Sequence, residues 1–181
     1  KEAEDLEKKV EDILRRVREL LEELHRRSEK ILKDVKDRSR DLLRRVREIL
    51  KRVEEKKERV REDELDKILK EVTERVKRVL EESEELLRRV EKVVKDINKR
   101  AEEILERVRK VVEDVLDDMR KKGVDERLVR EVEKKLRTVE EEVRRIVKEN
   151  KERLDEARED VKRSNKTIRD ELERARERIE T

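Results

Sequence analysis

The chain has 181 residues, of which 61% are charged, and its 57 basic and 54 acidic residues leave a net charge of +3. It has no aromatic residue, proline or cysteine and a single glycine, a composition typical of long helices and coiled coils. The lack of cysteine excludes disulfides and thiolate metal sites. No stretch approaches the roughly 20 apolar residues of a membrane span, and we expect no targeting signal. We expect a soluble protein with no native localisation signal, compatible with cytoplasmic expression.

The first expected element covers about residues 2–61. An Ile-Leu-x-x-Val pattern occurs at 13–17 and recurs after 18 residues at 31–35 and again at 49–53. Eighteen residues make five turns at 3.6 residues per turn, so the apolar stripe runs straight along the helix. The repeat therefore predicts a straight helix with little supercoil.

The second expected helix covers about residues 64–121. Its start is inferred, because no Gly or Pro marks it: the Ile-Leu pair arrives at 68–69, one residue later than the first repeat predicts. Asp63 can cap a new helix there, so we expect the turn near residues 61–64.

The third expected helix covers about residues 126–180. Gly123 suits the left-handed residue that follows a helix, and Asp125 suits the N-cap of the next one. On the first helix the apolar residues occupy a sector about 120° wide, as a helix with two neighbours requires; the second helix has nearly the same width and the third a slightly narrower one. We therefore predict an all-α fold, a long, untwisted, antiparallel, up-down-up three-helix bundle, as a single domain of residues 1–181.

Polar residues interrupt the apolar stripe at particular places. Asn98, for example, occupies the position that holds Leu80 and Leu116 one repeat away. In the predicted topology these polar residues fall at two heights, which we interpret as two buried hydrogen-bonded layers that select register and topology. The first predicted layer contains His25, Asn98, Asn150 and Ser28, and the second contains Ser39, Ser83, Ser164 and Asn165.

Three features of the chain are typical of one class of proteins. They are the repeat carried by ILRRV, ILKDV and ILKRV, the polar residues at two levels, and surfaces such as RRVREL and EEVRRI. The whole chain resembles computationally designed, parametric three-helix bundles with buried hydrogen-bond networks. That resemblance implies a de novo scaffold and brings no catalytic residue. Natural spectrin-like repeats are less similar, because their core aromatic residue is missing here and their helices are about half as long.

Few residues are candidates for chemistry. His25 is the only histidine, and without cysteine the other possible metal ligands are carboxylates on charged faces. No catalytic constellation and no Gly-rich phosphate loop can be placed, since the single glycine lies in a turn. We therefore expect no enzyme activity, no metal and no cofactor.

Partners of several classes are also disfavoured. Basic runs are interleaved with acids and no aromatic residue could stack on bases, so nucleic acid is not expected. Membrane surfaces are disfavoured for the same reason of mixed charge.

We predict a monomeric structural scaffold without evolved activity. The alternative is a designed helix-exchange, switch or binding module. In that reading the third helix, whose stripe is narrower, is displaced by a partner helix or pairs with one, and self-association is then possible.

Overall fold

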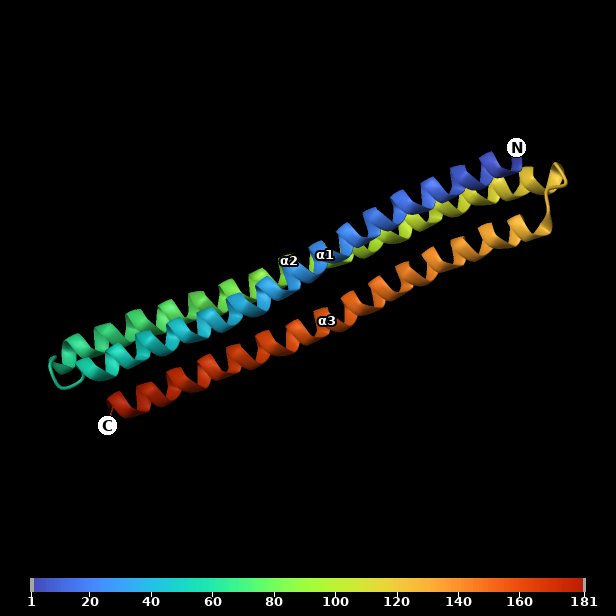
Figure 1. The fold of residues 1–181 in the computed structure, drawn as a ribbon. Coiled ribbons are helices and arrows are strands. Elements are labelled where there is room, and N and C mark those ends of the chain that lie inside the picture. Colours follow the sequence, from blue (N-terminus) through green and yellow to red (C-terminus); the bar gives the residue numbers. More distant parts are fainter. Residues whose placement is uncertain (1, 181) are drawn as a thin grey trace. The chain divides into compact units, whose positions relative to one another are not determined.

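The computed structural model describes residues 2–180, and three α-helices account for nearly all of them (Figure 1). These are α1 (Glu2–Lys56), α2 (Glu62–Lys121) and α3 (Glu126–Glu180). The described residues contain no β-strand. The prediction of an all-α, three-helix fold is confirmed.

Contacts divide the described residues into two compact units. Within the described residues, the first draws on the ranges 2–30 and 93–152, and the second on 31–92 and 153–180. The prediction of a single domain stays a prediction.

Each unit contains a segment of all three helices. In both units the residue numbers of contacting side chains rise together between α1 and α3 and run oppositely between α2 and α3. Within each unit, therefore, α1 and α3 are parallel and α2 is antiparallel to both.

Each unit has an aliphatic core of its own. In the first unit the fully buried side chains include Leu21, Met119 and Ile146, one from each helix. In the second unit Val46, Val76 and Ile168 play the same part. Burial of these aliphatic side chains makes the main favourable contribution to the stability of each unit. Among the described residues no helix is both long and apolar enough to cross a membrane.

Helix α1 ends at Lys56, earlier than the expected residue 61. Val53 is its last buried side chain, so the helix ends within one turn of its last fully buried residue. The last turn tightens instead: Lys57 N–H donates to Glu54 C=O at 3.3 Å and Arg59 N–H to Lys56 C=O at 3.0 Å. Both are bonds between residues three apart, as is common where helices end.

Helix α2 begins at Glu62, so the turn lies slightly before the expected 61–64. Leu65 N–H donates to Arg61 C=O at 2.9 Å, the first bond of the new helix. Asp63 lies inside the first turn, with Glu62 and Glu64, and not at the cap. Three carboxylates there still interact favourably with the positive end of the helix dipole.

A Schellman motif ends helix α2. Gly123 has φ of 67°, Val124 N–H donates to Met119 C=O at 3.0 Å, and Gly123 N–H donates to Arg120 C=O at 3.1 Å. Among the described residues Gly123 alone has a positive φ. The one glycine of the chain therefore lies where its conformational freedom is used.

Asp125 starts helix α3. Its carbonyl accepts from Leu128 N–H at 3.1 Å and Val129 N–H at 3.4 Å, while its carboxylate accepts from Arg127 N–H at 3.2 Å. These bonds satisfy N–H groups that have no partner within the helix.

Candidate functional site

Three polar side chains in the first unit form a continuous hydrogen-bonded chain, with one residue from each helix. Ser28 of α1 lies 2.8 Å from Asn150 Oδ1 of α3, and Asn150 Nδ2 donates to Asn98 Oδ1 of α2 at 2.8 Å. Ser28 and Asn150 are 0% exposed and Asn98 is 8% exposed. A buried polar chain of this kind is tolerated because each member has a partner.

The Ser28 hydroxyl has two acceptors and one proton. Its Oγ lies 2.8 Å from the His25 carbonyl oxygen as well as from Asn150 Oδ1. The hydroxyl can donate its one proton to only one of these two oxygens at a time.

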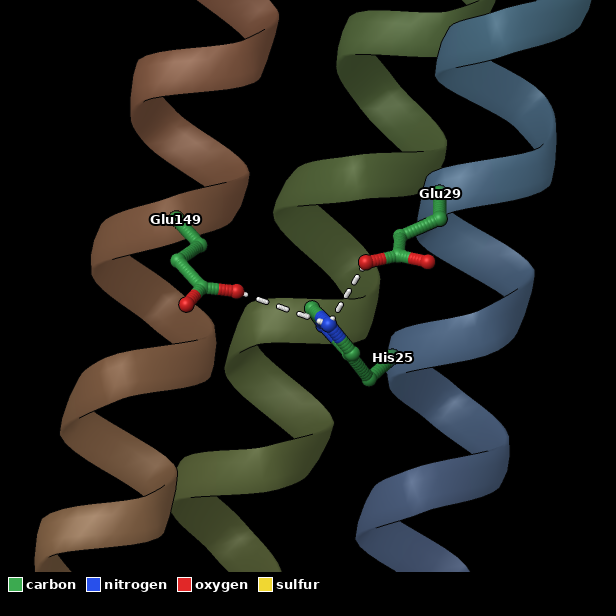
Figure 2. A group of neighbouring side chains, drawn as sticks. All are labelled: His25, Glu29 and Glu149. Carbon is green, nitrogen blue, oxygen red and sulfur yellow. Dashed lines mark ion pairs between the residues drawn. The ribbon is translucent and has the colours of Figure 1, made fainter.

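The side chain of His25 lies outside this chain and meets two carboxylates instead. Its Nε2 lies 2.8 Å from Glu29 Oε1 of the same helix and 3.5 Å from Glu149 Oε2 of α3 (Figure 2). The His25 side chain is 17% exposed, and its Nδ1 is buried with no hydrogen-bond partner. His25 therefore joins the polar layer through its backbone carbonyl alone.

Sequence reasoning missed Glu29 and Glu149, although two signals could have indicated them. Glu29 follows His25 by four residues, the spacing that places side chains on one helix face. Glu149 directly precedes Asn150, which already marks this height of α3. Among the described residues, His25, Glu29 and Glu149 form the group of histidine and carboxylate side chains that lie close enough to share one metal ion.

The second predicted layer is placed differently. Ser39, Ser83 and Asn165 are buried in the second unit, whereas Ser164 is half-buried. No hydrogen bond joins these four side chains among the described residues, and Ser39 Oγ and Asn165 Oδ1 have no partner. The second unit thus carries buried polar groups without the connected chain of the first.

Ionic contacts on the charged faces also connect the helices. In one group of charged side chains between α1 and α3, the neighbours shift the pKa values of two carboxyls. Partial burial and a hydrogen bond shared with Glu131 raise the pKa of the Glu7 carboxyl above its ordinary value. One turn away, a hydrogen bond from Lys135 and its charge lower the pKa of Glu11. These carboxyls bridge α1 and α3 on a solvent-exposed side of the first unit.

Comparison with known proteins gives one result for the fold and none for an activity. No protein-family model matches the chain, and no curated protein does either. A solved structure described as "Computationally designed three helix bundle" is similar with a TM-score of 0.58 and 15% identity, over 99% of this chain and 91% of that chain. The resemblance to designed three-helix bundles is thereby confirmed at the level of the fold.

Proposed function

We propose that the chain is a designed structural scaffold without evolved activity, whose helix register is specified by buried polar residues. The observation that carries the proposal is the Ser28–Asn150–Asn98 chain, because it joins all three helices of the first unit. Sliding or reversing any of these helices would leave buried amide or hydroxyl groups without partners, at about 1–3 kcal/mol each. The aliphatic positions of the repeat carry little register information, since a shift of 18 residues restores them.

A triple replacement by the residues of the repeat tests the proposal. Ser28→Val, Asn98→Leu and Asn150→Val convert the polar chain into the aliphatic side chains found one repeat away. We expect the free energy of unfolding to stay equal or rise, because an apolar core can replace a satisfied network without loss. We expect the unique register to be lost. The loss would appear as more than one set of amide resonances in the NMR spectrum, or as more than one molecular mass in solution.

The control changes the same core without touching a polar group. Val17→Ile, Leu105→Ile and Val143→Ile alter one buried side chain on each helix of the first unit. This control should keep one set of resonances. A single set and a single 22.3 kDa mass in the polar-to-aliphatic variant would contradict the proposed role of the polar chain.

A second candidate function is helix exchange, favoured by the composition of α3 in the second unit. Between residues 153 and 180 two of the buried positions are alanines, Ala157 and Ala175, and buried Asn165 has an oxygen without a partner. These positions bury less apolar area than the leucines and valines of the other helices, so this segment is held less strongly.

Exchange is tested with a fluorescent peptide of residues 125–181 added to the full chain. If α3 can be displaced, the label elutes with the full chain and a composition-matched scrambled peptide does not. Asn165→Val in the full chain should slow uptake, because it removes a buried unsatisfied amide from the resident helix. The mixture of peptide and full chain is also partly denatured and refolded together. If the label still does not elute with the full chain, exchange is rejected.

A further inference from the structure

We propose that His25, Glu29 and Glu149 form a binding site for one divalent transition-metal ion of the zinc class, between α1 and α3 of the first unit. The proposal adds a ligand site to the scaffold, and it is tested separately from the role of the polar chain in specifying register. It differs from the sequence-based expectation of no metal, which rested on the single histidine, the lack of cysteine and the placement of the carboxylates on charged faces.

The chemistry of the three donors selects the metal. One imidazole nitrogen and two carboxylate oxygens resemble the three-ligand sets that hold zinc and leave a fourth position for water. Imidazole suits zinc, cobalt, nickel and copper, whereas calcium and magnesium prefer oxygen donors alone. Glu29 Oε1 and Glu149 Oε2 both approach Nε2, and the three residues offer donor atoms that all lie within 4.8 Å of one another.

Two of the three donor–donor distances can be compared with those of a tetrahedral site. With metal–ligand bonds of about 2.0–2.2 Å, the donor atoms of a tetrahedral site are roughly 3.3–3.5 Å apart. His25 Nε2 lies 3.5 Å from Glu149 Oε2, which already fits, and 2.8 Å from Glu29 Oε1, which must open slightly. A glutamate side chain can supply that movement by rotation about its flexible bonds.

Charge and exposure also favour a bound cation. Two carboxylates converge on one imidazole nitrogen, which offers a divalent cation two anionic donors (Figure 2). Arg145 lies 3.6 Å from the other Glu149 oxygen, Oε1, and can keep that contact while Oε2 binds metal. Glu29 and Glu149 are 40% and 32% exposed at the side chain, which leaves a path for the ion and for a water ligand.

The ligands are held by rigid elements. His25 and Glu29 are four residues apart on one helix, and Glu149 is adjacent to Asn150, which hydrogen-bonds to Ser28 and Asn98. The polar chain therefore fixes the two helices that carry the ligands at this height.

One feature limits the affinity. A metal on Nε2 requires the proton on Nδ1, and Nδ1 is buried without a partner. Metal-binding histidines usually donate that proton to an acceptor, and loss of such a partner costs about 10–100-fold in affinity. Binding should therefore be weaker than at sites whose histidine has that support.

The test uses the full chain without a histidine tag, freed of metal with a chelator and titrated with Zn²⁺ and Co²⁺. Because the chain has one histidine, its imidazole nitrogen resonances report on this site alone. We expect one Zn²⁺ per chain, a shift of the Nε2 resonance, and a rise in the denaturant midpoint with Zn²⁺ concentration.

Matched variants decide the assignment. Glu149→Gln and Glu29→Gln should each weaken binding by 10-fold or more, and His25→Gln should abolish it. Glu152→Gln, the same change at an exposed glutamate one turn further along α3, should bind as the unchanged chain does. The two glutamate variants change partly exposed side chains only, so they remain informative if His25→Gln fails to fold. An unmoved histidine resonance at saturating Zn²⁺, or equal losses in Glu149→Gln and Glu152→Gln, would overturn the site.

Discussion

Ser28 and Ser39 are both buried serines of α1, but they differ in their partners. Ser28 bonds to Asn150, whereas Ser39 Oγ has no partner among the described residues. We expect Ser28→Ala to lower the free energy of unfolding by about 1–3 kcal/mol, since it leaves Asn150 with an unpaired buried atom. Ser39→Ala should leave it unchanged or raise it by up to about 1 kcal/mol, because no bond is lost and alanine favours helix.

The free energy of unfolding of both serine variants is measured by urea unfolding, monitored by circular dichroism. Each variant is the control for the other, because both replace a buried serine of α1 with alanine. Equal effects of the two substitutions would contradict a stabilising role for the Ser28 hydrogen bond.

Glu7 gives a prediction for the pH dependence of stability. Burial and Glu131 raise the pKa of Glu7 in the folded chain above the value of about 4.3 in an unfolded chain. The contribution of Glu7 is therefore fully present below about pH 4.3 and is lost as pH rises through the raised pKa. Relative to Glu7→Gln, the unchanged chain should become less stable between about pH 3.5 and about pH 7, measured by urea unfolding.

Glu11 provides the comparison with the opposite sign. Lys135 lowers the pKa of Glu11 in the folded chain, so its contribution is present above about pH 4.3 and is lost as pH falls through the lowered value. Relative to Glu11→Gln, the unchanged chain should become more stable between about pH 3.5 and about pH 7. The same slope for both variants would refute the assigned contacts.

Among the elements, the turn between α2 and α3 depends on one backbone conformation. Gly123 has φ of 67°, and a Cβ added there would meet nothing within 4 Å. Gly123→Ala should therefore destabilise the chain by strain alone, about 1–2 kcal/mol, without a steric clash. Gly123→Asn should cost less, since asparagine tolerates this conformation better. Thermal unfolding of both variants checks this, and equal losses for Asn and Ala would contradict it.

At the scale of the whole molecule, we expect a monomer. The outer faces carry both signs of charge, and among the described residues the large apolar side chains left exposed are Leu20 and Val111. Such isolated residues do not form an interface of their own. Sedimentation equilibrium should give 22.3 kDa over a wide concentration range. A dimer that disappears in Leu20→Glu with Val111→Glu would instead indicate self-association through the first unit.

The sequence by itself determined the helical fold and the residues that enter the cores. The 18-residue repeat follows the geometry of a single helix, and Gly123 and Asp125 act on their own neighbours, so both are readable without tertiary structure. The end of α1 is different, because residues 57–61 contain no Gly, Pro or unusual φ. The helix ends within one turn of Val53, its last buried side chain, and burial is a property of packing.

Only the tertiary structure decided which polar side chains meet. Burial of Ser28, Asn98 and Asn150 follows from the repeat, but their bonds depend on rotamers and on the relation between three helices. The same pattern placed His25 beside Asn98, whereas its ring lies against Glu29 and Glu149. A periodic pattern specifies the face of a helix on which a residue lies, and it contains no information about the direction in which a side chain at the edge of that face rotates.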